Sequence, residues 1–165
     1  MEVFLLQTVA GKAVLHRQAD LLSLWSFERK SCTETQRLRV PDLLAVKVLP
    51  SPQRSWVFLL DTAYNWSLLD SKLTVLQQGK LTGISHREDV VSCAWFEDEK
   101  WHLVLSLQPL RLHHLCFCFL NGALQTRTSE LLLSNDAHWP CRTSGVRAIS
   151  VVKGSLSRDY RVSTS

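Results

Sequence analysis

The chain has 165 residues, of which 45% are hydrophobic and 21% are charged. This composition excludes a disordered protein, and the length suffices for one core or two small ones. The formal net charge of +4 is a mild excess of dispersed basic residues, which argues against a nucleic-acid partner. No stretch reaches the ~18 uninterrupted apolar residues of a membrane span, so we expect no membrane association.

Short apolar runs separated by turn residues predict that nearly every element is a β-strand. The first set of expected strands lies at residues 3–9, 13–16, 21–27 and 37–40. Residues 21–27 could instead open a short helix, but Ser23 and Ser26 are poor helix formers and no amphipathic stripe follows. Pro41 cannot donate a hydrogen bond to a neighbouring strand, so it should end this set at a sheet edge.

Two further sets of strands follow. The second set is expected at residues 43–49, 56–61, 65–70 and 72–76, and the third at residues 89–95, 101–107, 115–122 and 123–133. The sequence Gln-Gln-Gly at 77–79 predicts a turn that closes the second set. The charged run 96–100 predicts a hairpin turn, and the pair Asn121-Gly122 is the strongest turn signal in the chain.

The chain changes character in its last part, residues 134–165. Residues 134–145 have the composition of a loop, and residues 146–152 predict one extra strand. Residues 154–165 are rich in Ser, Arg and Thr, so we expect a flexible basic tail there.

The strand sets recur with a period of about 45 residues, which predicts an all-β fold of about three four-stranded propeller-like blades. These blades would span residues 2–133, with approximate bounds at 2–40, 43–84 and 86–133. Propellers usually close with about 4–8 blades, so three form an incomplete ring. The chain would then be part of a longer propeller, a truncated form, or a half-ring that needs further blades or a partner chain.

Several short segments carry a resemblance to a known family. The Ser-His pair at 85–86 precedes the strand 90–95, where a Gly-His pair would open a repeat. The segments that end at Asp70 and Gly122 stand where a Trp-Asp dipeptide would close one. In these features residues 2–133 resemble the WD-repeat β-propeller family, which implies stacked blades that bind other proteins. No Trp-Asp dipeptide occurs, so the polar network of typical blades should be largely missing.

One segment, residues 113–118, contains residue types that bind metals. In a strand, His114, Cys116 and Cys118 would share one face, an arrangement compatible with zinc. A tetrahedral site would need further ligands, and the nearest ones lie in the following loop: His138 and Cys141. The simpler interpretation makes the two cysteines small buried hydrophobes beside the neighbouring phenylalanines, Phe117 and Phe119. We therefore expect no metal and no other cofactor.

A catalytic site is not indicated either. The segment that begins at His86 and ends at Asp89 offers a base, a cation and two acids, but the chain has no nucleophile elbow to accompany them. We expect His86 to be a hydrogen-bonded structural residue in a loop between two blades. The sequence therefore predicts a protein that is not an enzyme.

We predict a non-catalytic protein-interaction scaffold, or a subunit of a larger intracellular complex. Other proteins would dock on loops and exposed strand edges, with Trp56, Trp66 and Trp101 as anchors if they are exposed. The five cysteines lack the spacing of a disulfide framework, and no signal peptide stands out, which favours the nucleus or cytoplasm. The alternative is a small all-β sandwich or barrel that binds a ligand or nucleic acid.

Overall fold

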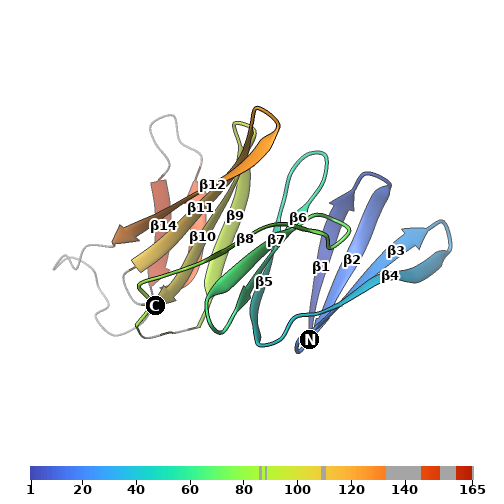
Figure 1. Ribbon diagram of the computed structural model, residues 1–165, viewed down its shortest axis with the longest axis horizontal. Helices are drawn as coiled ribbons and strands as arrows, with labels where there is room; N and C mark the ends of the chain where they lie inside the picture. Colours follow the sequence, from blue (N-terminus) through green and yellow to red (C-terminus); the bar gives the residue numbers. More distant parts are fainter. Residues whose placement is uncertain (86, 88, 109–110, 133–145, 153–158, 165) are drawn as a thin grey trace. The chain divides into compact units, whose positions relative to one another are not determined.

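The computed structural model describes residues 1–85, 87, 89–108, 111–132, 146–152 and 159–164, and every regular element in these ranges is a β-strand (Figure 1). The first sheet consists of β1 (Glu2–Thr8), β2 (Gly11–Gln18), β3 (Leu21–Glu28) and β4 (Ser31–Arg39). The second consists of β5 (Leu43–Leu49), β6 (Trp56–Asp61), β7 (Asn65–Leu69) and β8 (Val75–Lys80). The third consists of β9 (Val91–Glu97), β10 (Lys100–Gln108), β11 (Arg111–Leu120) and β12 (Ala123–Leu132), and a pair of strands follows as β13 (Val146–Val152) and β14 (Asp159–Thr164).

Each four-stranded sheet is an antiparallel meander in which every strand pairs with the next one along the chain. The predicted all-β fold of three four-stranded blades is confirmed, and the ring is not closed. The alternative from the sequence was a small all-β sandwich or barrel, whereas the described strands form three separate four-stranded sheets and one strand pair. Among these residues there is no helix with the length and apolar character that a membrane span requires.

Two-residue turns join the strands of the third sheet where the sequence predicts hairpins. Asp98 and Glu99 lie between β9 and β10 with φ angles of 51° and 58°. Asn121 and Gly122 lie between β11 and β12 with φ angles of 51° and 78°. Positive φ at both central positions is the geometry that matches the right-handed twist of the flanking strands. Both turns therefore fix the register of the sheet.

The chain divides into two compact units, residues 1–82 and residues 83–165. The first unit contains the sheets β1–β4 and β5–β8, drawn in blue and in teal to green (Figure 1). The second unit contains the sheet β9–β12 and the strand pair β13–β14, of which β13 lies against β9.

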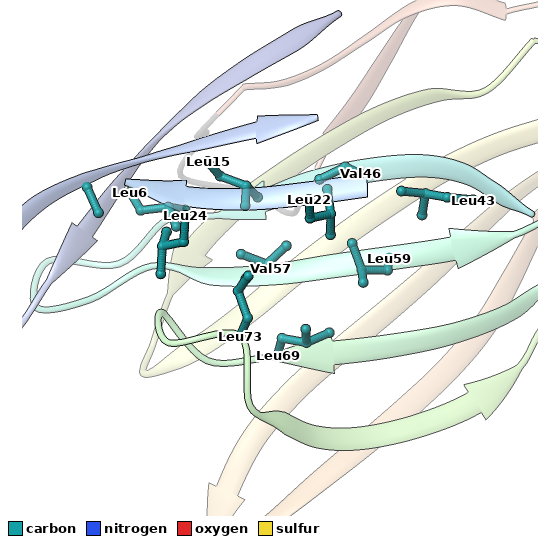
Figure 2. Packing of buried hydrophobic residues seen from close by; sticks show 11 residues of the cluster. Leu6, Leu15, Leu22, Leu24, Leu43, Val46, Val57, Leu59, Leu69 and Leu73 are labelled. Atoms are coloured by element: carbon teal, nitrogen blue, oxygen red, sulfur yellow. The ribbon is translucent and has the colours of Figure 1, made fainter. Parts of the chain in front are cut away.

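Aliphatic side chains hold the two sheets of the first unit together (Figure 2). The first sheet contributes Leu6, Ala13, Leu15, Leu22 and Leu24, and the second sheet and its last turn contribute Leu43, Val46, Val57, Leu59, Leu69 and Leu73. Strand residues at alternate positions share a face, so each sheet needs only every second residue to be apolar for this contact. Complete burial of one such side chain stabilises a fold by about 1.5–3 kcal/mol.

Polar groups also join the first sheet to the second. The Arg17 guanidinium donates to the backbone oxygen of Leu43 at 2.8 Å, and the Asp20 carboxylate accepts from the backbone N–H of Leu43 at 3.3 Å. The Ser55 hydroxyl accepts from the backbone N–H of Gln7 at 2.9 Å, and the Ser55 N–H donates to the Gln7 oxygen at 2.7 Å. Residues other than a Trp-Asp pair therefore supply the polar contacts between these sheets.

The end of the second sheet differs from the prediction. A strand was expected at 72–76 and a turn at 77–79, whereas β8 runs through Val75–Lys80. The turn lies earlier because the Asp70 carboxylate accepts two backbone N–H groups of the residues that follow it, each at 2.9 Å. A side chain that bonds its own downstream backbone in this way makes a turn without glycine.

Gly79 is therefore a strand residue whose role is packing. It lies directly opposite Trp66 in the pairing of β7 with β8. A Cβ atom at this position would come within 2.4 Å of Cζ2 of the indole. Only glycine leaves room for the Trp66 ring over this strand.

The last part of the chain contains more strand than was expected. The predicted extra strand is present as β13, and β14 pairs with it at Asp159–Thr164, within the range predicted to be a flexible tail. Tyr, Val and Thr between residues 160 and 164 favour extended backbone. The prediction of a tail considered only the Ser- and Arg-rich composition of the whole segment and did not take these residues into account. The predicted loop at 134–145 lies outside the described residues.

Candidate interaction surface

The three tryptophans expected to anchor partners are buried. Trp56, Trp66 and Trp101 are 1%, 4% and 8% exposed. The Trp66 ring stacks on Phe58 with centroids 6.0 Å apart, and the Trp101 ring meets the edge of Phe119 at 6.3 Å. A buried indole cannot contact a partner, so the condition attached to that hypothesis, surface exposure, is not met. His86 lies outside the described residues, and its structural role stays a prediction.

A stacked cluster of one indole and two imidazoles lies on one face of the third sheet. The ring of His102 is parallel to that of Trp95, with centroids 4.8 Å apart and an interplanar angle of 8°. The ring of His114 lies 5.9 Å from Trp95 and 5.3 Å from His102. The strands β9, β10 and β11 each supply one of the three rings, and cross-strand pairing brings them together.

The two imidazoles are hydrogen-bonded to each other. Nδ1 of His102 and Nε2 of His114 are 3.1 Å apart. One ring must donate and the other must accept, so at least one of the two is neutral while this bond exists. His102 is 1% exposed, so its ring is shielded from water. Ring stacking and this hydrogen bond therefore hold the three side chains together on one face of the sheet.

A hollow of about 490 Å³ opens beside this cluster. Residues of β10, β11 and β12 and of the turn between β9 and β10 line it. Its lining residues are Asp98, Glu99, Lys100, His102, His114, Cys116, Cys118, Phe119, Leu120, Gln125, Arg127, Thr128 and Ser129. The lining combines thiols, imidazoles, both signs of charge and two largely exposed apolar side chains, Phe119 and Leu120, at 48% and 52%.

The structure places the predicted metal-binding residue types on this surface. His114, Cys116 and Cys118 line the same hollow, as the alternation of a strand predicts. Cys116 and Cys118 are half-buried here, whereas Phe117 is fully buried on the opposite face. The interpretation that the cysteines pack in the core beside Phe117 was therefore wrong, because neighbouring residues of a strand point to opposite faces.

Within the described residues, no group of three or more His, Cys, Asp or Glu side chains is arranged to hold a metal ion. Of the four histidine and cysteine side chains in the hollow, His102 and His114 point ring nitrogens at each other instead. The further ligands considered from the sequence, His138 and Cys141, lie outside the described part of the chain.

Sequence reasoning missed Trp95, His102 and Arg127 as members of this surface. The signal was present in the two predicted turns. A two-residue turn at 98–99 pairs Trp95 with His102, and a two-residue turn at Asn121-Gly122 pairs Cys116 with Arg127. Counting outward from each turn would have placed these side chains on the face of Cys116.

A second polar group lies at the other end of the third sheet and holds the segment before it. Gln108 and Arg111 donate to the backbone oxygen of Gly83 at 3.2 and 3.1 Å, and Arg111 pairs with Glu130 at 3.7 Å. The neighbouring His113 is buried, and its Nε2 has no hydrogen-bond partner among the described residues. Burial lowers the pKa of His113, against the opposing effect of the Glu130 carboxylate, and Arg111 lowers it further. The fold therefore favours the neutral form of His113.

Comparisons with known proteins support the architecture. No protein-family model and no curated protein matches the sequence. In three dimensions the chain is similar to the crystal structure of the WD40 domain of SCAP from fission yeast, with a TM-score of 0.64 and 9% sequence identity. The chain has a WD40-like propeller fold. The similarity covers 98% of this chain and 41% of that one, so the chain spans less than half of the WD40 structure it matches.

Proposed function

We propose that the protein is a non-catalytic protein-interaction scaffold whose partner docks on the hollow of the third sheet. The observation that supports this is the combination of a WD40-like fold with a hollow lined by apolar and charged side chains. WD40 domains commonly bind other proteins, and stacked-blade architectures present their loops and sheet faces for that purpose.

The chemistry of the hollow fits a segment of another protein. Arginine side chains are enriched at protein interfaces, and the hollow is lined by Arg127 and by the half-exposed Leu120. The turn residues Asp98 and Glu99 add carboxylates at one end, so the docked segment would pair a cation with them. A hollow of about 490 Å³ holds one or two anchoring side chains rather than a whole domain.

We further propose that the protein works as a subunit of a larger complex in the nucleus or cytoplasm. Three blades leave the ring open, and propellers usually close with about 4–8. Completion by another chain would satisfy the exposed strand edges that otherwise invite uncontrolled pairing.

The experiment that tests the proposal compares the proteins recovered from cells with tagged surface variants of this chain. Arg127→Glu and Leu120→Asp change the hollow, and Arg54→Glu makes the same charge change as Arg127→Glu at an exposed loop position that does not line it. We expect quantitative mass spectrometry to show that the two hollow variants lose a stoichiometric protein partner that Arg54→Glu retains, with or without nuclease treatment. An unchanged set of proteins for all three variants would refute the proposed docking site, and partners lost only after nuclease treatment would favour nucleic-acid binding instead.

A further inference from the structure

A second apolar surface lies on the first sheet, on the face opposite to the one that packs on β5–β8. The side chains of Leu5, Val14 and Trp25 are direct cross-strand neighbours on β1, β2 and β3. Their chain neighbours, including Leu6 and Leu24, belong to the buried cluster of the first unit, so these three point the other way. The first sheet therefore has an apolar row on both of its faces.

This outer row is in contact with solvent. Leu5 is 61% exposed, and Val3, beside it on β1, and Phe27, beside Trp25 on β3, are 63% and 55% exposed. Val14 and Trp25 are partly exposed at the centre of the row. A contiguous apolar patch of this kind on a folded chain marks an interaction site, and repeat proteins keep outer faces that remain in water polar.

The rim of this face is basic. Lys12, Arg37 and Arg39 lie at the same face as the apolar row and are exposed. The nearest carboxylate on the face, Glu34, is held by Arg37 through two hydrogen bonds of 2.6 and 2.9 Å. Lys12 and Arg39 therefore leave a positive charge on this face. Two copies of the chain packed through this face would repel each other, whereas carboxylates of a different protein would complement the charge.

We propose that this face binds a partner protein that presents the apolar face of an antiparallel β-sheet with acidic residues along its rim. The inference rests on the proposed scaffold function and adds a second docking surface to it. The opposite face of the same sheet shows how an apolar row of this kind is covered. There, aliphatic side chains of the first sheet pack on the sheet β5–β8. Two sheets that pack face to face lie about 10 Å apart, and their side chains fill the space between them. The row of Leu, Val and Trp therefore fits a row of apolar side chains on a sheet of the partner.

The test is site-specific photo-crosslinking of the full chain in cells. The photo-reactive residue p-benzoylphenylalanine replaces Leu5 or Phe27 on the face and, as a control, Thr62 in the exposed turn after β6. We expect both face positions to crosslink to one protein, at residues of a β-strand flanked by Asp or Glu, and Thr62 not to do so. The double variant Arg37→Glu, Arg39→Glu should reduce the yield of that crosslink about tenfold. Circular dichroism melting confirms that each variant is folded.

Other outcomes overturn the proposal. Crosslinks between two copies of the chain, or a dimer in sedimentation that Leu5→Asp dissolves, would show that the face binds itself. Crosslinks only to chaperones, only to helical or unstructured segments, or none at all, would show that no β-sheet partner covers it. A partner that depends on Arg127 while the first-sheet positions stay silent would leave the scaffold function standing and remove this second surface alone.

Discussion

Replacing Gly79 with alanine should destabilise the chain, although the same change at most strand positions would stabilise it. Gly79 does not have a positive φ, so alanine fits its backbone and would ordinarily gain about 0.4–1 kcal/mol by restricting the unfolded chain. Here the added Cβ would come within 2.4 Å of Cζ2 and 2.5 Å of Cε2 of Trp66. Trp66 is 4% exposed and stacks on Phe58, so the indole cannot move aside freely. Overpacking of this kind costs about 1–3 kcal/mol, which reverses the sign of the effect.

The assay is urea unfolding of the full chain followed by far-ultraviolet circular dichroism, a signal that does not depend on Trp66 itself. We expect Gly79→Ala to lower the free energy of unfolding by about 1–2 kcal/mol. In the background of Trp66→Leu, which removes the clashing ring atoms, the same change should cost less than about 0.5 kcal/mol. If Gly79→Ala is neutral or stabilising, the packing explanation for this glycine is refuted. An equal cost in both backgrounds would show that the strain lies in the backbone instead.

Two further predictions concern the polar groups. Arg17→Ala should lower the free energy of unfolding by about 1.5–3 kcal/mol in urea titrations, because it removes a charged hydrogen bond to Leu43 from a side chain that is only 14% exposed. The control Glu2→Ala removes only the half-exposed ion pair between Arg17 and Glu2 at 3.1 Å, and it should cost less than about 1 kcal/mol. Equal costs for the two variants would show that the ion pair, and not the bond to Leu43, accounts for the effect. The pKa of His113 lies below its ordinary 6.5 in the folded chain, so the unfolded chain binds the proton more tightly, and this contribution to stability is complete above pH 6.5 and decreases as the pH falls toward the lowered value. His113→Leu should flatten that part of the curve of unfolding free energy against pH, and an unchanged curve would contradict the assignment.

The contacts between the first two sheets show how a propeller-type stack can form without the family's typical dipeptide. Aliphatic side chains from alternate strand positions supply the apolar contact, and the Arg17 and Asp20 side chains bond the backbone where the second sheet begins. Because the partners in these bonds are backbone groups, only the residue that supplies the side chain must be of a particular type. This explains how a chain with 9% identity to a WD40 domain can share its fold.

The candidate surface was predictable in part. Strand alternation placed His114, Cys116 and Cys118 together correctly, because that pattern depends on a single strand. Trp95 and Arg127 come from other strands, and their positions depend on the register that the two-residue turns set. The burial of Trp56, Trp66 and Trp101 could not be predicted, since an apolar residue on a strand faces either a core or solvent with the same local pattern.

The sequence by itself determined most of the strands, most of the turns and the grouping into three sheets. These features depend on local chemistry: alternating apolar residues, proline, and the Asn-Gly pair act within a few residues of each other. Only the tertiary structure decided which face of each sheet is covered, why Gly79 must be glycine, and where the imidazoles meet. Those outcomes depend on which strands pair and which sheets stack. Such contacts join residues that are far apart in the chain, and no local pattern records them.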